Sequence, residues 1–421
     1  MLTNAELILG LHRHLSAFAA SPATAALGQL SFAGQVFEIA WRLRGSGVST
    51  GHRVAAIGVD AAIGQRTLLR DVLPALAALG WVELDVREGT LYSVSEAIPP
   101  PAELVNLADA VLAVALPTPV EKAALALVLA TTRQPLLTDA AIEAGMAGGG
   151  ASEEDAVAAL RHLAALSLVR RLTTDDGREI VFNPNVWVGD TEVMTAALRV
   201  EDARVRTEIG ALIEEISANP GMPQDHVTST ERKWVDFAVA LGLVQRSLVV
   251  TSDHKERAFL FTPHIARDPF GIRSGDPSGH VRQLIGSMIY ATTFAEYRLD
   301  YPAAFVRRLL QDGEAGDASP ISTDYPMLEK AGIVRVEPAM RYSKLVLLQA
   351  DVAEGALQYL EDRAGGTGSA TARGLGAQRS YIHVERERAR LAHTAPVDSV
   401  EARRLMSALR DTTARRDFRV R

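Results

Sequence analysis

The stretch at residues 155–184, DAVAALRHLAALSLVRRLTTDDGREIVFNP, carries the pattern on which the fold prediction depends. Its first half spaces apolar residues so that they line one face of a helix: Ala156, Ala159, Leu160, Leu163 and Leu166. A short apolar run, Leu168–Val169, then precedes a polar segment with Asp176-Gly177 and a second β-rich run, Ile180–Phe182. Asp-Gly between two such runs favours a tight hairpin, because both central residues of a type I′ turn need positive φ. The stretch therefore predicts a helix that leads directly into a β-hairpin.

Three other stretches share this pattern, namely Leu73–Val94, Trp234–Phe261 and Pro326–Leu348. In each of the four, a helix is expected to end at a small residue that is followed by an apolar residue, a valine and a charged or amide residue. These junction residues are Gly80, Ser167, Gly242 and Gly332. Glycine suits the position because a helix that ends in the left-handed conformation there avoids a clash with Cβ. The spacing of about 75–90 residues leaves room for one small domain per junction, although an ordinary helix-to-strand connection in an α+β protein has the same local pattern.

A helix followed by a β-hairpin is the second half of a winged helix-turn-helix domain, and residues 155–184 resemble that family. Expected helices over about 120–131 and 137–147 supply the first half. At the level of pattern the resemblance covers roughly residues 30–350, and it extends to no named subfamily. It implies an α+β, mainly α, fold of about four tandem winged-helix domains with a long connecting helix and a flexible basic C-terminal tail.

The expected domain boundaries follow from the four junctions and from segments rich in Pro and Gly. Pro99–Pro101 closes the first domain, residues 266–280 precede the fourth, and Gly365–Gly376 has the composition of a flexible linker. The predicted divisions are residues 1–100 (N-terminal helices and first winged helix), 101–190 (second), 191–275 (connecting helix and third), 276–363 (fourth) and 364–421 (linker and basic helical tail).

The composition is that of a soluble globular protein, with 48% apolar and 23% charged residues. The sequence has no run of about 18 apolar residues, which argues against a membrane span. Glu6, His12 and Arg13 fall among the N-terminal apolar positions and argue against a signal peptide, so we expect a cytoplasmic protein. The excess of Ala and Arg favours a bacterial source. The lack of cysteine excludes disulfides, thiol catalysis and cysteine-ligated zinc.

Charge is distributed unevenly along the chain. The net charge is −7, but residues 373–421 contain twelve Arg against six Asp and Glu, a net +6, so residues 1–372 carry −13. A negative body weighs against a nucleic-acid partner unless Arg and Lys gather on one face. The basic tail, with its apolar cluster of Leu405, Met406 and Leu409, is interpreted as an extension that binds a protein partner or forms a homodimer.

The resemblance implies DNA contacts at defined places, because the third helix of a winged helix enters the major groove and the hairpin touches phosphates or the minor groove. At the start of its third helix the first domain offers Gln65, Arg66 and Arg70, whose side chains suit adenine, guanine and phosphate. The second domain instead offers Ser152 to Asp155, a helix cap with three carboxylates that would repel phosphate.

The third domain is the preferred DNA contact because basic residues occur at both places. Arg232 and Lys233 begin its third helix, and its hairpin carries His254, Lys255 and Arg257. In the fourth domain, Arg341 and Lys344 alternate along the hairpin and suit phosphate contacts. The open alternative in each domain is an ordinary solvated surface.

The sequence lacks the signatures of catalysis, since it contains no phosphate loop, no Gly-x-Ser-x-Gly elbow and no His-Glu-x-x-His. We therefore predict no catalytic residue, metal site or cofactor, and an enzyme with an unrecognised Asp/His site is the least favoured interpretation. The favoured function is duplex-DNA binding, as a bacterial transcriptional regulator or another DNA-binding factor. The alternative is a non-catalytic adaptor or scaffold subunit of a multiprotein complex in chromosome organisation or defence.

Overall fold

The computed structural model describes residues 3–173, 177–183, 203–263, 276–318, 321–338, 342–361, 375–392 and 403–404. It contains 56% helix and 18% strand, and its sheets are small and antiparallel. The predicted α+β, mainly α, class is therefore confirmed. Within these residues, no helix combines the length and the apolar character that crossing a membrane requires.

The same order of elements occurs four times: a helix, a strand, two helical segments and two further strands. In each case the last strand lies between the other two in the sheet. Unit 1 consists of α3 (Gly28–Leu43), β1 (Val48–Thr50), α4 (Gly51–Asp60), the continuous run α5 (Gln65–Thr67), η1 (Leu68–Val72) and α6 (Leu73–Ala78), β2 (Val82–Arg87) and β3 (Thr90–Glu96). Unit 2 consists of α9 (Pro119–Arg133), β4 (Leu136–Leu137), α10 (Thr138–Met146), α11 (Glu153–Ala165), β5 (Arg170–Thr173) and β6 (Glu179–Phe182).

Units 3 and 4 repeat this order with shorter middle helices. Unit 3 consists of α13 (Ala203–Ala218), β7 (Met222–Pro223), η2 (Gln224–His226), α14 (Arg232–Ala240), β8 (Gln245–Thr251) and β9 (Glu256–Phe261). Unit 4 consists of α16 (Pro302–Asp312), β10 (Glu314–Ala318), α17 (Ile321–Asp324), α18 (Pro326–Lys330), β11 (Val334–Pro338) and β12 (Ser343–Leu347). The remaining elements are α1 (Asn4–Leu15), α2 (Pro22–Ala25), α7 (Pro101–Leu104), α8 (Ala108–Ala115), α15 (His280–Thr293), α19 (Ala350–Glu361), β13 (Gln378–Ile382) and α20 (Val384–Ala392).

All four junction residues adopt the left-handed conformation that the sequence predicts. Their φ angles are +74° at Gly80, +54° at Ser167, +77° at Gly242 and +71° at Gly332. At each junction the N–H of the next residue donates to the carbonyl five residues earlier, which is the bond of a Schellman cap. The four helix-to-hairpin joints are therefore one local structure used four times.

Two further features of unit 1 have an equally local cause. Pro74 cannot donate a backbone hydrogen bond, and the helix is interrupted just before it, where Leu73 donates to the carbonyl five residues back at Leu68. The first hairpin turns at Glu88 and Gly89, whose φ angles of +50° and +77° are those of a type I′ turn. The predicted Asp176-Gly177 turn lies partly outside the described residues, but β5 and β6 on either side of it pair as a hairpin.

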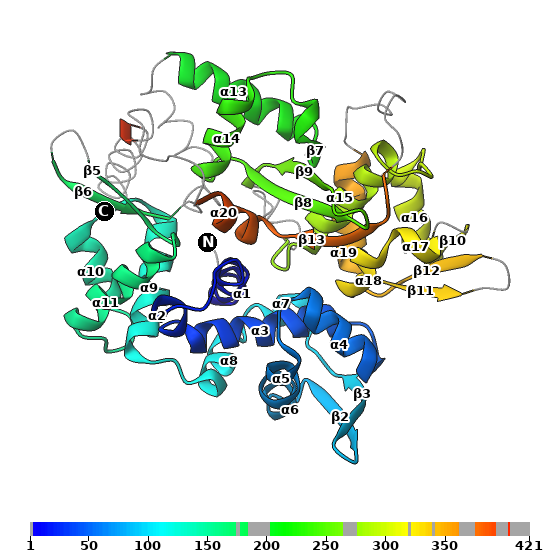
Figure 1. The fold of residues 1–421 in the computed structure, drawn as a ribbon, viewed down its shortest axis with the longest axis horizontal. Coiled ribbons are helices and arrows are strands. Elements are labelled where there is room, and N and C mark those ends of the chain that lie inside the picture. Colours follow the sequence, from blue (N-terminus) through cyan, green and yellow to red (C-terminus); the bar gives the residue numbers. More distant parts are fainter. Residues whose placement is uncertain are drawn as a thin grey trace.

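Figure 1 shows the four sheets arranged around a centre occupied by α1 and α20. Helix α1 packs against α3, α9 and α20, so it is buried on its polar side as well as its apolar side. Neighbouring units share cores: Leu172 and Phe182 of unit 2 belong to one apolar cluster with Ile209 of unit 3, and Phe259 of unit 3 belongs to another with Leu309 and Val334 of unit 4. The units are thus fused through apolar contacts, while the predicted domain boundaries stay predictions.

Buried ion pairs connect α1 to units 1 and 4. Glu38 in α3 accepts hydrogen bonds from Nε of Arg13 in α1 (2.8 Å) and Nε of Arg42 (2.7 Å). Arg42 also donates to Oδ2 of Asp60 (2.8 Å) and to the carbonyl of Lys330 in unit 4 (3.2 Å). Burial by itself would raise the pKa of Glu38, but the two arginines outweigh it and hold that pKa well below its usual range. Separating any of these buried charges from its partner would leave the partner unpaired. The network therefore holds α1, α3 and the adjoining part of unit 4 in fixed positions.

Units 1 and 4 also meet through a close approach of their backbones. A Cβ placed on Gly332 would lie 1.9 Å from the carbonyl oxygen of Arg42, so this junction needs glycine for space as well as for φ. Next to it, the buried side chain of Gln349 donates to the carbonyls of Trp41 (2.9 Å) and Gly332 (3.1 Å). This contact positions unit 1 at one edge of the molecule with its hairpin projecting outward (Figure 1).

The C-terminal segment, residues 375–392, differs from the prediction of a flexible tail. Strand β13 pairs with β8 of unit 3, and α20 packs against α1, β8 and α14. Tyr381 is buried in an apolar core, and Tyr290 donates to the carbonyl of Gly376 (2.7 Å). The segment is therefore part of the folded body, because its apolar side chains and backbone groups find partners there. The rest of the predicted tail, with Leu405, Met406 and Leu409, lies outside the described residues.

Candidate nucleic-acid interface

The third helix of unit 1 presents the three polar residues predicted there. Gln65, Arg66 and Arg70 are exposed, and within the described part of the chain none of their three side chains has a hydrogen bond or ion pair. Arg66 and Arg70 are four residues apart and are therefore neighbours on the helix surface. The helix begins at Gly64, which provides no side-chain cap. Its first turn consequently keeps open backbone N–H groups next to two unpaired guanidinium groups.

The hairpin of unit 1 adds residues that were not predicted from the sequence. Nη2 of Arg87 lies 2.8 Å from Oδ2 of Asp85, and the guanidinium carbon of Arg87 lies 4.4 Å from the ring centroid of Tyr92. Tyr92 and Val86 are exposed. The hairpin therefore offers an aromatic ring and an aliphatic side chain to a partner, while the charge of its arginine is offset by a carboxylate. Val86 and Tyr92 belong to the two runs on either side of the turn, in which apolar and polar residues alternate. That alternation is the sequence signal by which they could have been predicted.

In unit 3, each basic residue predicted to contact DNA has a polar neighbour. The positive charges of its Arg and Lys side chains are offset by carboxylates on the same or adjacent elements. The pairs are Arg232 Nε to Asp236 Oδ2 (3.9 Å), Lys233 Nζ to Glu231 Oε2 (2.6 Å), Lys255 Nζ to Asp253 Oδ2 (2.8 Å) and Arg257 Nη1 to Asp225 Oδ2 (3.3 Å). His254 has φ +61°, and its Nε2 lies 3.4 Å from Nη1 of Arg379 in the C-terminal segment. This surface presents less free positive charge than its sequence indicates.

Units 2 and 4 contribute little free positive charge at the predicted positions. Ser152 and Asp155 form the expected capping box at the start of α11, so the acidic first turn is a helix cap. Lys344 in unit 4 is held 2.6 Å from Oε1 of Glu314. Arg341 lies outside the described residues.

A cleft of about 390 Å³ in unit 3 brings two predicted residues together with two that the sequence did not suggest. Arg232 and Arg257 line it, and so do Arg246 of β8 and Arg390 of α20. Arg246 is buried and donates through Nε (3.0 Å) and Nη2 (2.8 Å) to Oε1 of Glu387 in α20. No sequence pattern indicates this cleft, because its walls come from segments separated by about 140 residues.

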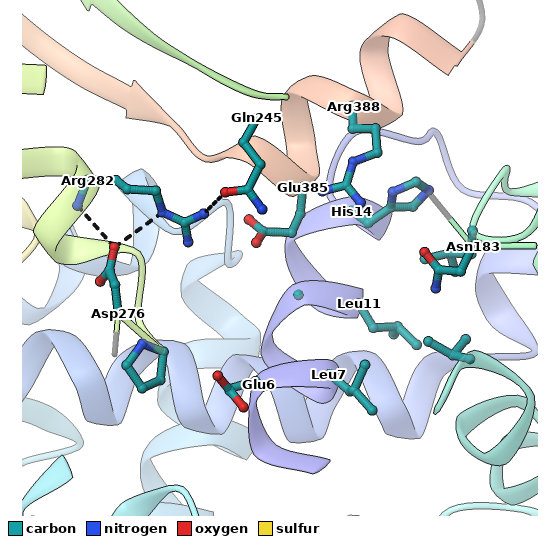
Figure 2. A pocket seen from close by; sticks show the side chains of 14 residues that line it. Glu6, Leu7, Leu11, His14, Asn183, Gln245, Asp276, Arg282, Glu385 and Arg388 are labelled. Carbon is teal, nitrogen blue, oxygen red and sulfur yellow. Dashed lines mark hydrogen bonds and ion pairs between the residues drawn. The ribbon is translucent and has the colours of Figure 1, made fainter. Parts of the chain in front are cut away.

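The centre of the molecule holds a smaller cavity of about 70 Å³ between α1, units 2 and 3, and α20. Figure 2 shows Asp276 and Arg282 on one side of it, with Gln245, Glu385, Arg388 and His14 across the space. Arg282 donates through Nε to Oδ2 of Asp276 (3.2 Å) and through Nη1 to Gln245. Since a water molecule takes up about 30 Å³ of liquid, this cavity is sized for a few waters and not for an organic ligand.

Buried histidines around this centre stay neutral. Nε2 of His14 lies 2.7 Å from the carbonyl oxygen of Leu166, which makes that nitrogen the donor. Burial lowers the pKa of His12 and of His14 to about 4, and that of His280 to about 3. Among the described residues, no three His, Asp or Glu side chains are arranged to hold a metal ion. These histidines are therefore structural groups of the core.

Comparison with known proteins gives no relative. No family model matches the chain, and it has no significant match among curated proteins or solved structures.

Proposed function

We propose that this chain is a tandem winged-helix protein that binds duplex DNA, with the third helix of unit 1 as its principal contact. The fourfold repeat of helix, strand, two helices and two strands, with the last strand central in each sheet, supports the winged-helix assignment. The observation that carries the DNA-binding proposal is the exposed and unpaired set of Gln65, Arg66 and Arg70 at the start of that helix.

The chemistry of these side chains fits a DNA groove. Arginine donates a bidentate pair to guanine, glutamine pairs with adenine, and either arginine can instead neutralise a phosphate. The helix lies at the rim of the molecule beside the projecting β2–β3 hairpin (Figure 1), so a duplex could reach it without displacing another unit. In unit 3, by contrast, Arg232 and Arg257 line a cleft of which α20 forms one wall, and a duplex enters such a cleft less readily than it reaches the rim. A role as a bacterial transcriptional regulator follows if the binding is sequence-selective.

The test is the affinity of the full chain for a labelled mixed-sequence duplex, measured by fluorescence anisotropy in 50 mM salt. We expect Arg66→Gln/Arg70→Gln to weaken binding about tenfold or more, because two charge-assisted contacts are lost. The matched control, Arg232→Gln/Lys233→Gln, removes the same charge and should change the affinity by less than about threefold. Equal losses in the two variants, or no binding by the wild-type chain, would overturn the proposal.

A second candidate function, a non-catalytic adaptor in a multiprotein complex, is favoured by a different observation. Unit 1 exposes large apolar side chains on β1, α4, η1 and the β2–β3 hairpin, and these could contact a protein partner: Val48, Val59, Leu69, Val86 and Tyr92. The net charge of −7 also favours a protein partner. A photo-crosslinker at Tyr92 should then give one defined protein adduct in the source cells, and Val86→Asp should abolish it. A diffuse set of adducts would argue against this role.

A further inference from the structure

The cleft in unit 3 has the size and lining of a ligand site. Its volume of about 390 Å³ falls in the range of small-molecule pockets. Four arginines from four elements border it: Arg232 of α14, Arg246 of β8, Arg257 of β9 and Arg390 of α20. Three carboxylates also line the cleft, those of Asp225, Glu256 and Glu387, so the lining carries one net positive charge.

Arg246 forms the rigid part of this lining. Its side chain is buried and is held by Glu387, by Oε1 of Gln224 (3.0 Å) and by Oδ1 of Asp236 (3.1 Å). These partners come from η2, α14 and α20, so Arg246 ties three walls of the cleft together. Its guanidinium therefore supplies a fixed positive charge and holds the cleft open in one shape.

The guanidinium groups of Arg232, Arg257 and Arg390 have N–H donors that are unpaired or only weakly paired within the protein. Nε of Arg232 is 3.9 Å from Asp236, beyond hydrogen-bond distance, and that side chain is 77% exposed. Nε of Arg257 is buried without a hydrogen-bond partner, while its guanidinium carbon lies 5.1 Å from the ring centroid of Phe294. Arg390 pairs with exposed Glu256 at 3.2 Å and with buried Glu387 at 3.3 Å, and its own side chain is 41% exposed. Exposed pairs of this kind are weak, so an anion that accepts two or more hydrogen bonds can displace them.

We propose that this cleft binds the phosphate group of a small organic phosphate of about nucleotide size. A phosphate offers three or four acceptor oxygens, which suits arginines converging from separate elements. The apolar wall of Leu248, Ala258 and Leu391 would cover the non-phosphate part of the ligand. Because α20 forms one wall, the cleft admits a small molecule more readily than a duplex. The proposal is independent of DNA binding by unit 1.

The test uses the full chain, with sodium pyrophosphate and adenosine monophosphate as probes, titrated by calorimetry at constant ionic strength. We expect both probes to bind, and Arg232→Gln/Arg390→Gln to weaken the binding about tenfold or more. Arg246 is left intact because its loss would remove the two shortest hydrogen bonds of buried Glu387 and could unfold the unit. The matched control, Arg307→Gln/Arg308→Gln, removes two exposed arginines of α16 that pair with carboxylates, and it should keep the wild-type affinity for both probes.

Each outcome decides the proposal. If neither probe binds at millimolar concentration, or if the two double variants bind them equally, the cleft is not a phosphate site. If pyrophosphate binds and adenosine monophosphate does not, a phosphate site exists but the nucleotide-sized ligand is ruled out. A labelled duplex that competes with bound pyrophosphate would assign the cleft to the DNA backbone and refute a separate small-molecule site. Thermal unfolding of each variant checks that a loss of binding is not a loss of folding.

Discussion

The protonation of buried histidines makes a quantitative prediction about stability. His12, His14 and His280 have folded-state pKa values of about 4, 4 and 3, because burial disfavours the charged imidazolium. In the unfolded chain each returns to its ordinary pKa of 6.5. Below pH 6.5 these histidines are therefore protonated in the unfolded chain, while they stay neutral in the folded chain. Stability is fully present above pH 6.5 and is lost as the pH falls toward 4.

The size of the loss follows from these values. One pKa unit corresponds to about 1.4 kcal/mol, so each histidine costs roughly 2 kcal/mol between pH 6.5 and 5. The three together cost about 6 kcal/mol, a large share of the roughly 5–15 kcal/mol that stabilises a typical folded protein. Replacing His14 by Gln removes one titrating group, while the amide can still donate to the carbonyl of Leu166. The variant should therefore lose about 2 kcal/mol less than wild type over the same pH range.

The assay is urea unfolding followed by circular dichroism at pH 7 and pH 5, for wild type, His14→Gln and the control His52→Gln. His52 is exposed, and its replacement controls for the loss of one imidazole outside the core. If His14→Gln loses as much free energy of unfolding between pH 7 and pH 5 as wild type does, the assignment of His14 as a buried neutral group is refuted.

Two substitutions test the joints between the units. Glu38→Gln removes the anion between two buried arginines and should cost about 3–5 kcal/mol in urea unfolding, whereas Glu337→Gln in an exposed pair should cost at most about 1 kcal/mol. Similar costs for the two would mean that the buried network is not structural. Gly332→Ala places a Cβ 1.9 Å from the carbonyl oxygen of Arg42 and should cost more than about 3 kcal/mol, measured as a fall in the thermal midpoint. Gly80→Ala, with a similar φ but open space, should cost roughly 1–2 kcal/mol, and equal shifts would show that the close backbone approach is absent.

Features that depend on neighbouring residues could be predicted from the sequence. The left-handed junctions at Gly80 and Gly332 depend on a few adjacent side chains and occur as predicted, and the turn at Glu88 and Gly89 has the same local origin. The exposure of Arg66 follows in the same way from its place in a local helical pattern. Each feature depends on backbone sterics that act within about six residues.

Features that depend on distant residues could not be predicted. The docking of α20 on β8 buries Glu387 against Arg246, two residues about 140 positions apart, and no periodicity in either segment signals this contact. The same contact explains why residues 375–392 fold although their composition is that of a basic tail. The carboxylate beside Arg257 comes from η2 of the same unit, and only the folded chain brings Asp225 to it. Positive charge in a sequence is thus a poor guide to positive charge on a surface.

The dependence of duplex affinity on salt is the most direct test of DNA binding through Arg66 and Arg70. Each phosphate contact by Lys or Arg contributes about 0.9 to the slope of log affinity against log salt. If Arg66 and Arg70 contact phosphates, the slope is steep for the wild-type chain and smaller by about 2 for Arg66→Gln/Arg70→Gln. The slope for Arg232→Gln/Lys233→Gln is then the same as for wild type. A wild-type slope retained by the Arg66→Gln/Arg70→Gln variant would contradict these contacts, because DNA would then be bound elsewhere on the protein.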